Sequence, residues 1–303
     1  MKLGFVSAIL EECDFKQVVD TASDFGFQCI EMACWPKEKA KRRYAGVSHI
    51  DTENLTEEKA HKIRSYLQEK NIEISALAYY PNPMDENLES RERALDHLNS
   101  VMHAAKLLGI EIVATFIGRA QNKTVEENLQ LFEKIWTPVI KKAEELHIKI
   151  AIENCPMYFG REQWPAGQNI AYSPEVWKEM FKRIPSEYFG LNYDPSHFIW
   201  QQMDYIAPLY EFKHKIFHIH YKDIKLYPEK LKARGILSYP LEYMSPKLPG
   251  LGDVNWKEFI SALKDISYTG NTCIEIEDKA YEDTLEKKKD SLLLSKHYIE
   301  QYL

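Results

Sequence analysis

The amino-acid sequence predicts an α/β protein whose parallel strands close into a (β/α)8 TIM barrel. Eight short apolar runs alternate with helix-forming segments along the 303 residues, which is the pattern of repeated βαβ units. The apolar runs are nearly continuous, as is typical of parallel strands that helices cover on one side. The last four runs each end in a carboxylate or an imidazole, and the strand ends of a parallel barrel meet at one mouth.

The expected strands are KLGFVSA, QCIEMAC, EISALAYY, EIVATFIG, KIAIEN, EYFGLNYD, KIFHIHYKD and NTCIEIED. Helices are predicted over residues 14–25, 56–70, 88–108, 125–146 and 281–303 from apolar spacing, capping residues and Gly109. Residues 154–173 and 223–254 are expected to form long loops at the mouth. A doubly wound open sheet is the alternative fold, but its Gly-rich phosphate turn after the first strand is missing. We expect residues 1–303 to form one TIM-barrel domain.

Charge and hydropathy limit the partners of the protein. The net charge of −7 disfavours a nucleic-acid partner, and the basic run KEKAKRR over 37–43 is interpreted as a solvated loop or helix face. No apolar run approaches the ~20 residues that cross a bilayer, and the N-terminus does not resemble a signal peptide. We therefore expect a cytoplasmic protein with no membrane partner.

The five cysteines are odd in number and form no CxxC pair. Cys29, Cys155 and Cys273 lie in or beside apolar runs. They are predicted to be reduced core residues.

Four polar side chains at successive strand ends predict a site for a divalent cation; they are Glu153, Asp194, His220 and Glu275. Each has an ordinary structural explanation by itself, such as a turn residue, a core histidine or an exposed strand-end acid. Together they favour a metal, because several buried ionic groups at one mouth are costly without a cation. An octahedral ion such as Mn²⁺ or Mg²⁺ would keep two open positions for two adjacent oxygens of a hydroxy-ketone.

Side-chain alternation places further polar groups beside these four. His218, His220 and Lys222 share one face of their strand, and Glu275 and Glu277 share one face of theirs.

The motifs resemble those of the sugar phosphate isomerase/epimerase family, within the xylose-isomerase-like barrel superfamily. The matching segments are Ile-Glu153-Asn, Asp194-Pro-Ser-His197, His218-Ile-His220-Tyr-Lys222-Asp223, Pro249-Gly-Leu-Gly-Asp253-Val-Asn-Trp256 and Ile-Glu275-Ile-Glu277-Asp278. The resemblance spans the chain and is sharpest from Glu153 onward.

The resemblance implies that Glu153, Asp194, His220 and Glu275 are the metal ligands. His220 aligns with the second His of the family's HxHxKD pattern, and Glu275 with the first acid of its last strand; either choice can shift by two residues on the same face. One divalent ion is implied, with Mn²⁺ preferred over Mg²⁺, Co²⁺ and Zn²⁺.

In ketose epimerases of this family, the two metal-binding glutamates also exchange protons with the substrate. Glu153 and Glu275 are the corresponding catalytic pair, and they would act beside a metal-bound carbonyl through an enediolate. His197 would hydrogen-bond a substrate oxygen; the alternative is a helix-start residue that points to solvent.

Several other residues are candidates for substrate binding. Lys222 would hold a carboxylate ligand or the substrate in place. An ion pair in the barrel core without a role in binding is an equally good interpretation. Trp35 and Trp164 would stack on a sugar or pack within loops. Arg119 would bind substrate oxygens or a phosphate. Arg161 and Arg234 are weaker candidates, because arginines in long loops usually lie on the surface without a binding role.

The sequence also departs from the family pattern. Ketose 3-epimerases carry a further glutamate six residues after the first catalytic one, where this chain has Phe159. This difference favours a larger substrate, such as a cyclic keto-sugar. No Gly-rich phosphate cradle is evident.

The resemblance therefore predicts a metal-dependent isomerase or epimerase acting on a keto-sugar or related polyol, with a small carbohydrate as partner; a homo-oligomer is left open. A lyase or dehydratase, inosose dehydratase-like or cleaving 3-keto-glycosides, would share the first step. An endonuclease IV-like nuclease is a distant alternative, because that class uses three metals and needs histidines on strands two to four. A catalytically silent binding barrel is disfavoured by the intact glutamates.

Overall fold

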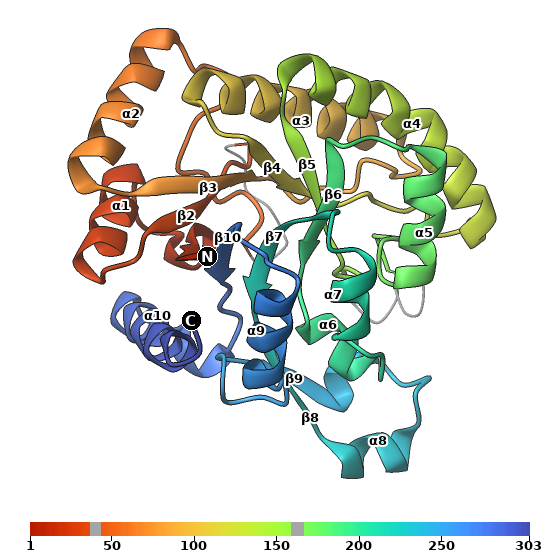
Figure 1. Ribbon diagram of the computed structural model, residues 1–303. Coiled ribbons are helices and arrows are strands. Elements are labelled where there is room, and N and C mark those ends of the chain that lie inside the picture. Colours follow the sequence, from red (N-terminus) through yellow and green to blue (C-terminus); the bar gives the residue numbers. More distant parts are fainter. Residues whose placement is uncertain (37–43, 159–166) are drawn as a thin grey trace.

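Eight parallel strands pair in a closed ring in the order β1-β10-β7-β6-β5-β4-β3-β2 in the computed structural model, which describes residues 1–36, 44–158 and 167–303 (Figure 1). The strands are β1 (Lys2–Val6), β2 (Cys29–Ala33), β3 (Glu73–Ala78), β4 (Ile112–Thr115), β5 (Lys149–Glu153), β6 (Phe189–Tyr193), β7 (Ile216–Tyr221) and β10 (Asn271–Ile274). Closure of the ring confirms the predicted TIM barrel and eliminates the open doubly wound sheet.

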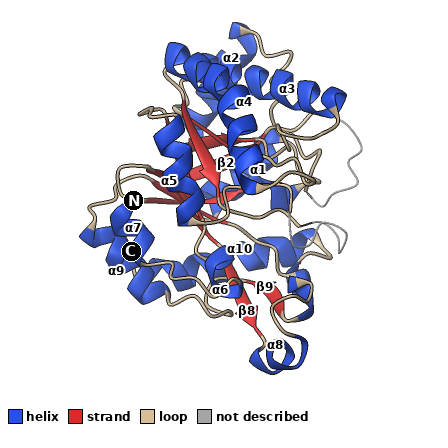
Figure 2. Cartoon of the chain, turned by 90° about the vertical axis from the view of Figure 1, so that its right-hand side faces the viewer, coloured by secondary structure: helices blue, strands red, loops and turns tan. Residues whose placement is uncertain are grey.

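Helices surround the ring and cover its outer face (Figures 1 and 2). They are α1 (Phe15–Asp24), α2 (Glu57–Lys70), α3 (Leu88–Leu108), α4 (Val125–Leu146), α5 (Pro174–Arg183), α6 (Ser196–Trp200), α7 (Ala207–Glu211), α9 (Trp256–Asp265) and α10 (Leu285–Glu300), with short 3₁₀ turns η1 (Ser7–Leu10) and η4 (Lys279–Tyr281). No helix among the described residues is long and apolar enough to cross a membrane.

Local capping residues explain why the helix boundaries were predictable. In α3, the Asn87 side chain accepts a hydrogen bond from the Ser90 amide at 3.0 Å, and Gly109 ends the helix with φ 72°. In α4, Thr124 and Glu127 form a reciprocal capping box. Helix α10 begins later than predicted because Thr284 is its N-cap, and the residues before it form η4.

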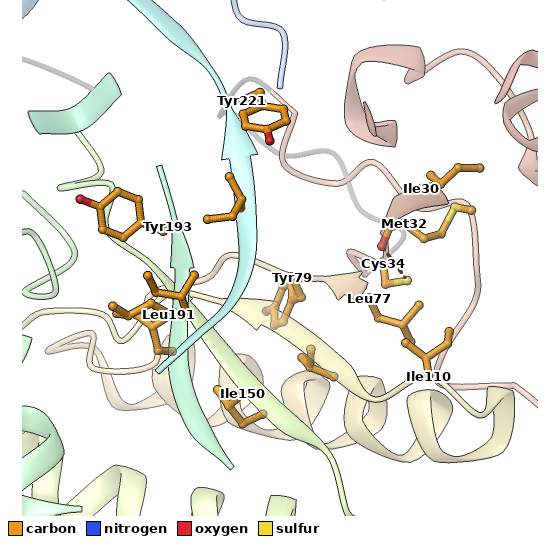
Figure 3. Close-up of a cluster of buried hydrophobic side chains, with 14 of the residues drawn as sticks. Ile30, Met32, Cys34, Leu77, Tyr79, Ile110, Ile150, Leu191, Tyr193 and Tyr221 are labelled. Atoms are coloured by element: carbon orange, nitrogen blue, oxygen red, sulfur yellow. Dashed lines mark hydrogen bonds between the residues drawn. The ribbon is translucent and has the colours of Figure 1, made fainter. Parts of the chain in front are cut away.

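Alternation along the strands sorts large apolar side chains outward and small or polar ones inward. Figure 3 shows the outer set, in which Ile30 and Met32 of β2, Leu77 of β3 and Tyr193 of β6 pack beneath the helices. Inside the barrel, the small residues Ala76 and Ala78 of β3 and Ala114 of β4 belong to a separate cluster. This cluster also contains Tyr80 and Phe116, which follow the ends of these two strands. The small residues leave room at the barrel interior for polar groups.

The connection between β7 and β10 was predicted as a loop over 223–254, and this prediction was wrong for most of its length. Residues 223–247, here called the excursion, form β8 (Asp223–Leu226), α8 (Pro228–Arg234), η3 (Pro240–Glu242) and β9 (Met244–Lys247). Strands β8 and β9 pair antiparallel, with Asp223 opposite Lys247 and Leu226 opposite Met244. Figures 1 and 2 show β8, α8 and β9 extending away from the ring beyond the end of β7. The paired residues are 18 to 24 positions apart in the sequence and β9 contains Pro246, so local patterns gave no strand signal there.

One carboxylate holds the base of the excursion to the barrel. Asp223 accepts hydrogen bonds from the backbone amides of Ile224, Gly250 and Val254 and from the Trp256 indole, at 2.8–3.1 Å. A longer bond of 3.3 Å comes from the Gly252 amide, and a Cβ at Gly252 would lie 2.1 Å from Asp223 Oδ1. The glycine-containing segment is therefore shaped around this carboxylate.

We predict that Asp223→Asn lowers the free energy of unfolding by about 2–4 kcal/mol, because an amide nitrogen would face donors that now have an acceptor. Urea denaturation followed by circular dichroism measures the change. The control is Asp283→Asn, since Asp283 makes only an exposed ion pair with Lys287 at 2.9 Å, and a change below about 0.5 kcal/mol is expected. Equal effects in the two variants would contradict the anchoring role of Asp223.

Candidate metal centre and cavity

Four neighbouring strands bring together the side chains that the sequence predicts as metal ligands. Glu153 ends β5, Asp194 follows β6, His220 lies near the end of β7 and Glu275 follows β10. One potential ligand atom from each residue lies within 4.8 Å of the corresponding atoms of the other three. The barrel thus assembles the predicted set, while its metal-binding role stays a prediction.

Three of these ligand atoms are enclosed by protein and make no hydrogen bond of good geometry with a described residue: Asp194 Oδ2, His220 Nδ1 and Glu275 Oε2. The last two lie 3.0 Å from each other. Their neighbouring atoms are engaged, since Asp194 Oδ1 accepts from the Ser196 amide at 2.8 Å. Unpaired buried polar atoms are costly, and a cation would satisfy all three together. Carboxylate oxygens with one imidazole nitrogen suit Mn²⁺, Mg²⁺, Co²⁺ or Zn²⁺. The donor set therefore fits a divalent ion.

Hydrogen bonds from asparagine side chains to the backbone fix the positions of Glu153 and Asp194. The Asn154 side chain donates to the Asp194 carbonyl at 2.9 Å and accepts from the Asp194 amide at 2.8 Å. The Asn169 side chain donates to the Glu153 and Cys155 carbonyls at 3.0 and 2.7 Å. These bonds hold the ends of β5 and β6 rigid where the ligands project.

The two glutamates have opposite electrostatic environments. Burial raises the pKa of the Glu153 carboxyl, and the charge of Glu275 raises it further. Burial also disfavours the charged form of Glu275, but Lys222 and His220 outweigh it and hold its pKa below the usual range. In the metal-free chain, Glu153 is therefore the carboxyl that protonates more readily, and Glu275 stays ionised.

Glu31 is a buried carboxylate in the middle of β2 that the sequence analysis missed. Its Oε2 lies 2.7 Å from His220 Nε2, and its Oε1 accepts the Tyr80 hydroxyl at 2.7 Å. His218 Nδ1 lies 3.4 Å from the same Oε2. With Nε2–H donating to Glu31, the free Nδ1 of His220 faces the other three ligands. An acid inside the apolar run QCIEMAC was the available signal.

His218 faces the barrel interior below the ligand cluster. Its Nδ1 lies 3.0 Å from Asn192 Oδ1 and its Nε2 lies 3.0 Å from Ser75 Oγ. Both ring nitrogens therefore have protein partners, which favours His220 over His218 as the ligand.

Lys222 is buried among carboxylates. Its Nζ lies 2.7 Å from Glu277, 3.4 Å from Glu275 and 4.0 Å from Asp194. Burial lowers the pKa of Lys222, but the surrounding carboxylates, Glu275 first, raise it well above the usual range. The ammonium group is thus held charged beside the ligands, and it also lines the cavity described below.

His197 is only 7% exposed, so the alternative of a side chain pointing to solvent is wrong. Its Nε2 lies 3.1 Å from Asp194 Oδ2 and 3.4 Å from Glu153 Oε1. Neither ring nitrogen makes a hydrogen bond of good geometry to a described residue. His197 is therefore an available donor beside the ligand cluster.

A cavity of about 390 Å³ opens onto the ligand cluster, with Glu153, His197, Lys222, Glu275 and Glu277 in its wall. Aromatic side chains that the sequence analysis did not single out also line it: Tyr80, Phe116, Tyr158 and Trp200. Trp200 had a usable signal, because it lies three residues after His197 and helical spacing puts both on one face of α6.

Of the other predicted binding residues that the structure describes, only one lies in the cavity wall. Trp35 lines the cavity. Arg119 does not; its backbone exchanges two hydrogen bonds with the Asn82 side chain, at 2.8 and 2.9 Å. Arg234 pairs with Glu242 at 3.2 Å on the excursion surface. Trp164, Arg161, Phe159 and the basic run 37–43 lie outside the described residues.

All five cysteines are free, as predicted. Cys29 and Cys273 are buried in the barrel. The prediction of a core position for Cys155 was wrong: it is half-buried and lines the cavity. The residue directly follows Asn154 at the end of β5, so it belongs to the mouth of the barrel and not to the layer between strands and helices.

A family model described as xylose isomerase-like TIM barrel matches residues 19–296. The chain belongs to the xylose isomerase-like TIM barrel family. The resemblance drawn from the sequence motifs is thereby confirmed at the level of this superfamily.

Individual relatives of this family are distant. The uncharacterized protein YfiH of Bacillus subtilis is 26% identical over 312 residues, covering 92% of this chain and 93% of the relative. The IOLI protein, solved with a bound zinc atom, has a TM-score of 0.74 at 19% identity, covering 100% of this chain and 99% of the other. A D-psicose 3-epimerase of Clostridium cellulolyticum, solved with D-tagatose, has a TM-score of 0.72 at 14% identity, with the same coverage. The two solved structures share the fold.

We predict that Glu31→Gln raises the Kd for Mn²⁺ by about 10- to 100-fold, because His220 loses the carboxylate that orients its ring and increases its basicity. Isothermal titration calorimetry on metal-free protein measures this change. The matched control is Glu53→Gln, which weakens another carboxylate–imidazole contact, 3.0 Å from His97, outside the cavity wall. An unchanged Kd in Glu31→Gln would contradict the supporting role.

Proposed function

We propose that this chain is a divalent-metal-dependent isomerase or epimerase that acts on a keto-sugar or related polyol. The observation that carries the proposal is the pair Glu153 and Glu275, which share a four-residue ligand cluster with unpaired buried donor atoms at the base of a cavity. A carboxylate is a weak base toward carbon unless a cation makes the C–H acidic. The proposed cation, with Mn²⁺ preferred, supplies that acidity when bound.

The residues of the chain divide the remaining work. One of Glu153 and Glu275 takes the proton from the carbon beside the carbonyl, and the other returns a proton to the opposite face or to the neighbouring carbon. The Nε2 of His197 lies 3.4 Å from Glu153 Oε1. We expect the His197 side chain to hydrogen-bond a substrate oxygen. Lys222 keeps Glu275 and Glu277 in place through contacts of 3.4 and 2.7 Å.

The relatives support this class of reaction. One structure of the same fold holds a zinc atom, and another is a sugar 3-epimerase solved with a ketose. A lyase on the same site would begin with the same proton abstraction and then expel a leaving group, so the reaction products decide between the two outcomes. Manganese and a cytoplasmic location remain part of the proposal.

We predict that the Mn²⁺-loaded protein, incubated in D₂O with keto-sugars, keto-inositols and 3-keto-glycosides, places deuterium beside the carbonyl of its substrate. EDTA should abolish this exchange and Mn²⁺ should restore it. Product NMR measures deuterium incorporation and distinguishes epimer, isomer and elimination product. Metal analysis should find one ion per chain, and three ions would favour the nuclease alternative.

We predict that Glu153→Gln and Glu275→Gln each lower the exchange rate by about 100- to 10,000-fold, because each removes a proton carrier. Metal content is measured on the same samples, so that loss of the ion is separated from loss of the base. Glu286→Gln, at an exposed position of α10, is the control and should exchange at the normal rate. Undiminished exchange in either active-site variant would overturn the assignment.

A further inference from the structure

Two groups of residues with different chemistry line the cavity, here called its polar and its apolar end. The polar end carries Glu153 and Glu275 of the ligand cluster with His197 and Lys222, and the apolar end belongs to the excursion. The excursion residues in the cavity wall, apart from Asp223, are Ile224, Tyr239, Pro240, Leu241, Met244 and Pro246. Five of these six side chains are aliphatic or proline, so the excursion offers an apolar surface facing a polar one.

Asp223 does not change the character of the apolar end. It is the one charged excursion residue in the cavity wall among those that the structure describes. Its two oxygens already accept bonds from four backbone amides and the Trp256 indole. A free sugar carries a hydroxyl on nearly every carbon, and hydroxyls buried against aliphatic side chains would lose hydrogen bonds to water. The apolar end is therefore poorly suited to a bare sugar ring.

Helix α6 joins the two ends and carries a second unpaired donor. The Trp200 indole lines the cavity, and its Nε1 is buried without a hydrogen bond to any described residue. Its ring packs with Ile224 and Tyr243 beneath the excursion and lies 5.8 Å from the Tyr158 ring in an edge-to-face arrangement. Since Trp200 is on the same face of α6 as His197 and packs with Ile224 of the excursion, its ring connects the polar and the apolar ends.

We propose that the substrate is a ring-keto glycoside with an aryl or alkyl aglycone, whose sugar lies at the ligand cluster and whose aglycone lies against the excursion. This inference rests on the proposed function. The chemistry limits where the carbonyl can be: an anomeric carbon that carries an aglycone is locked as an acetal or a ketal. A substrate with both a free carbonyl and an aglycone must therefore carry its carbonyl on another ring carbon.

The dimensions and exposure of the cavity agree with such a substrate. A volume of about 390 Å³ is in the range of pockets that enclose drug-sized ligands. Leu241 lines this cavity and is 49% exposed, so an apolar aglycone would remove its side chain from water.

The first test compares methyl and phenyl 3-keto-D-glucopyranosides, in both anomeric series, as substrates for deuterium exchange by the Mn²⁺-loaded protein. Burial of one aromatic ring should raise kcat/KM for the phenyl compound by about 10- to 100-fold over the methyl compound. Equal values for the two compounds would overturn the inference and leave the proposed function intact. Absence of exchange with every keto-sugar would instead overturn the proposed function.

A pair of variants locates the apolar site. Leu241→Asp should reduce the phenyl-to-methyl ratio of kcat/KM to near one, because it places a charge where the aglycone would lie. Ile236→Asp is the matched control, since Ile236 belongs to the same excursion, is 62% exposed and does not line the cavity. It should keep the wild-type ratio. Equal ratios in the two variants would place the aglycone elsewhere and overturn the inference.

A binding measurement keeps the inference separate from turnover. Phenyl and methyl D-glucopyranosides lack the carbonyl and cannot react, so their Kd values, in both anomeric series, are measured by quenching of tryptophan fluorescence and by calorimetry. The phenyl compound should bind about 10- to 100-fold more tightly in the favoured series, and Leu241→Asp should remove this difference. Equal affinities in both series would contradict an aglycone site whatever the catalytic result.

Discussion

The structure depends on the burial of several carboxylates at one mouth of the barrel. Glu31, Glu153 and Asp194 are enclosed, and the Oε2 of Glu275 is enclosed beside them. Such a group of like charges is tolerated only with positive partners or a cation. His220 contacts Glu31 on one side, at 2.7 Å, and Glu275 on the other, at 3.0 Å. A cation at the ligand cluster would replace the proton on the second side, so metal binding and protonation of this histidine exclude each other.

The barrel architecture makes this burial feasible by separating two layers. The apolar layer between strands and helices supplies the hydrophobic stabilisation, and Figure 3 shows its large side chains. The interior is then free to hold alanines, buried polar groups and a cavity. Strand β2 contributes to both layers. Its Glu31 points inward and contacts His220, while Ile30 and Met32 on either side pack outward against the helices. The ligand cluster belongs to the ring of strands, whereas the apolar end of the cavity belongs largely to the excursion. The two parts of the cavity wall therefore come from different segments of the chain.

Much of the fold was predictable because its determinants are local. Helix caps at Asn87 and Thr124, the stop at Gly109 and the eight apolar runs each act within a few residues. Strands β8 and β9 were missed because each is short and pairs with a strand that is distant in sequence. Cys155 was misplaced for a related reason: it lies just beyond the apolar run IAI, but the strand ends two residues earlier, at Glu153.

The sequence by itself determined the barrel and the residue types at its strand ends, because strand periodicity fixes which side chains point inward. Strand ends and periodicity limited the candidates to Glu153, Asp194 and two pairs of inward-facing residues. The family resemblance then selected His220 over His218 and Glu275 over Glu277. Only the tertiary structure decided what supports and surrounds them. The contact between Glu31 and His220 joins residues 189 positions apart, and no periodic pattern encodes such a distance. The unpaired Trp200 indole and the apolar excursion wall likewise acquire meaning only where chain closure places them beside the ligand cluster.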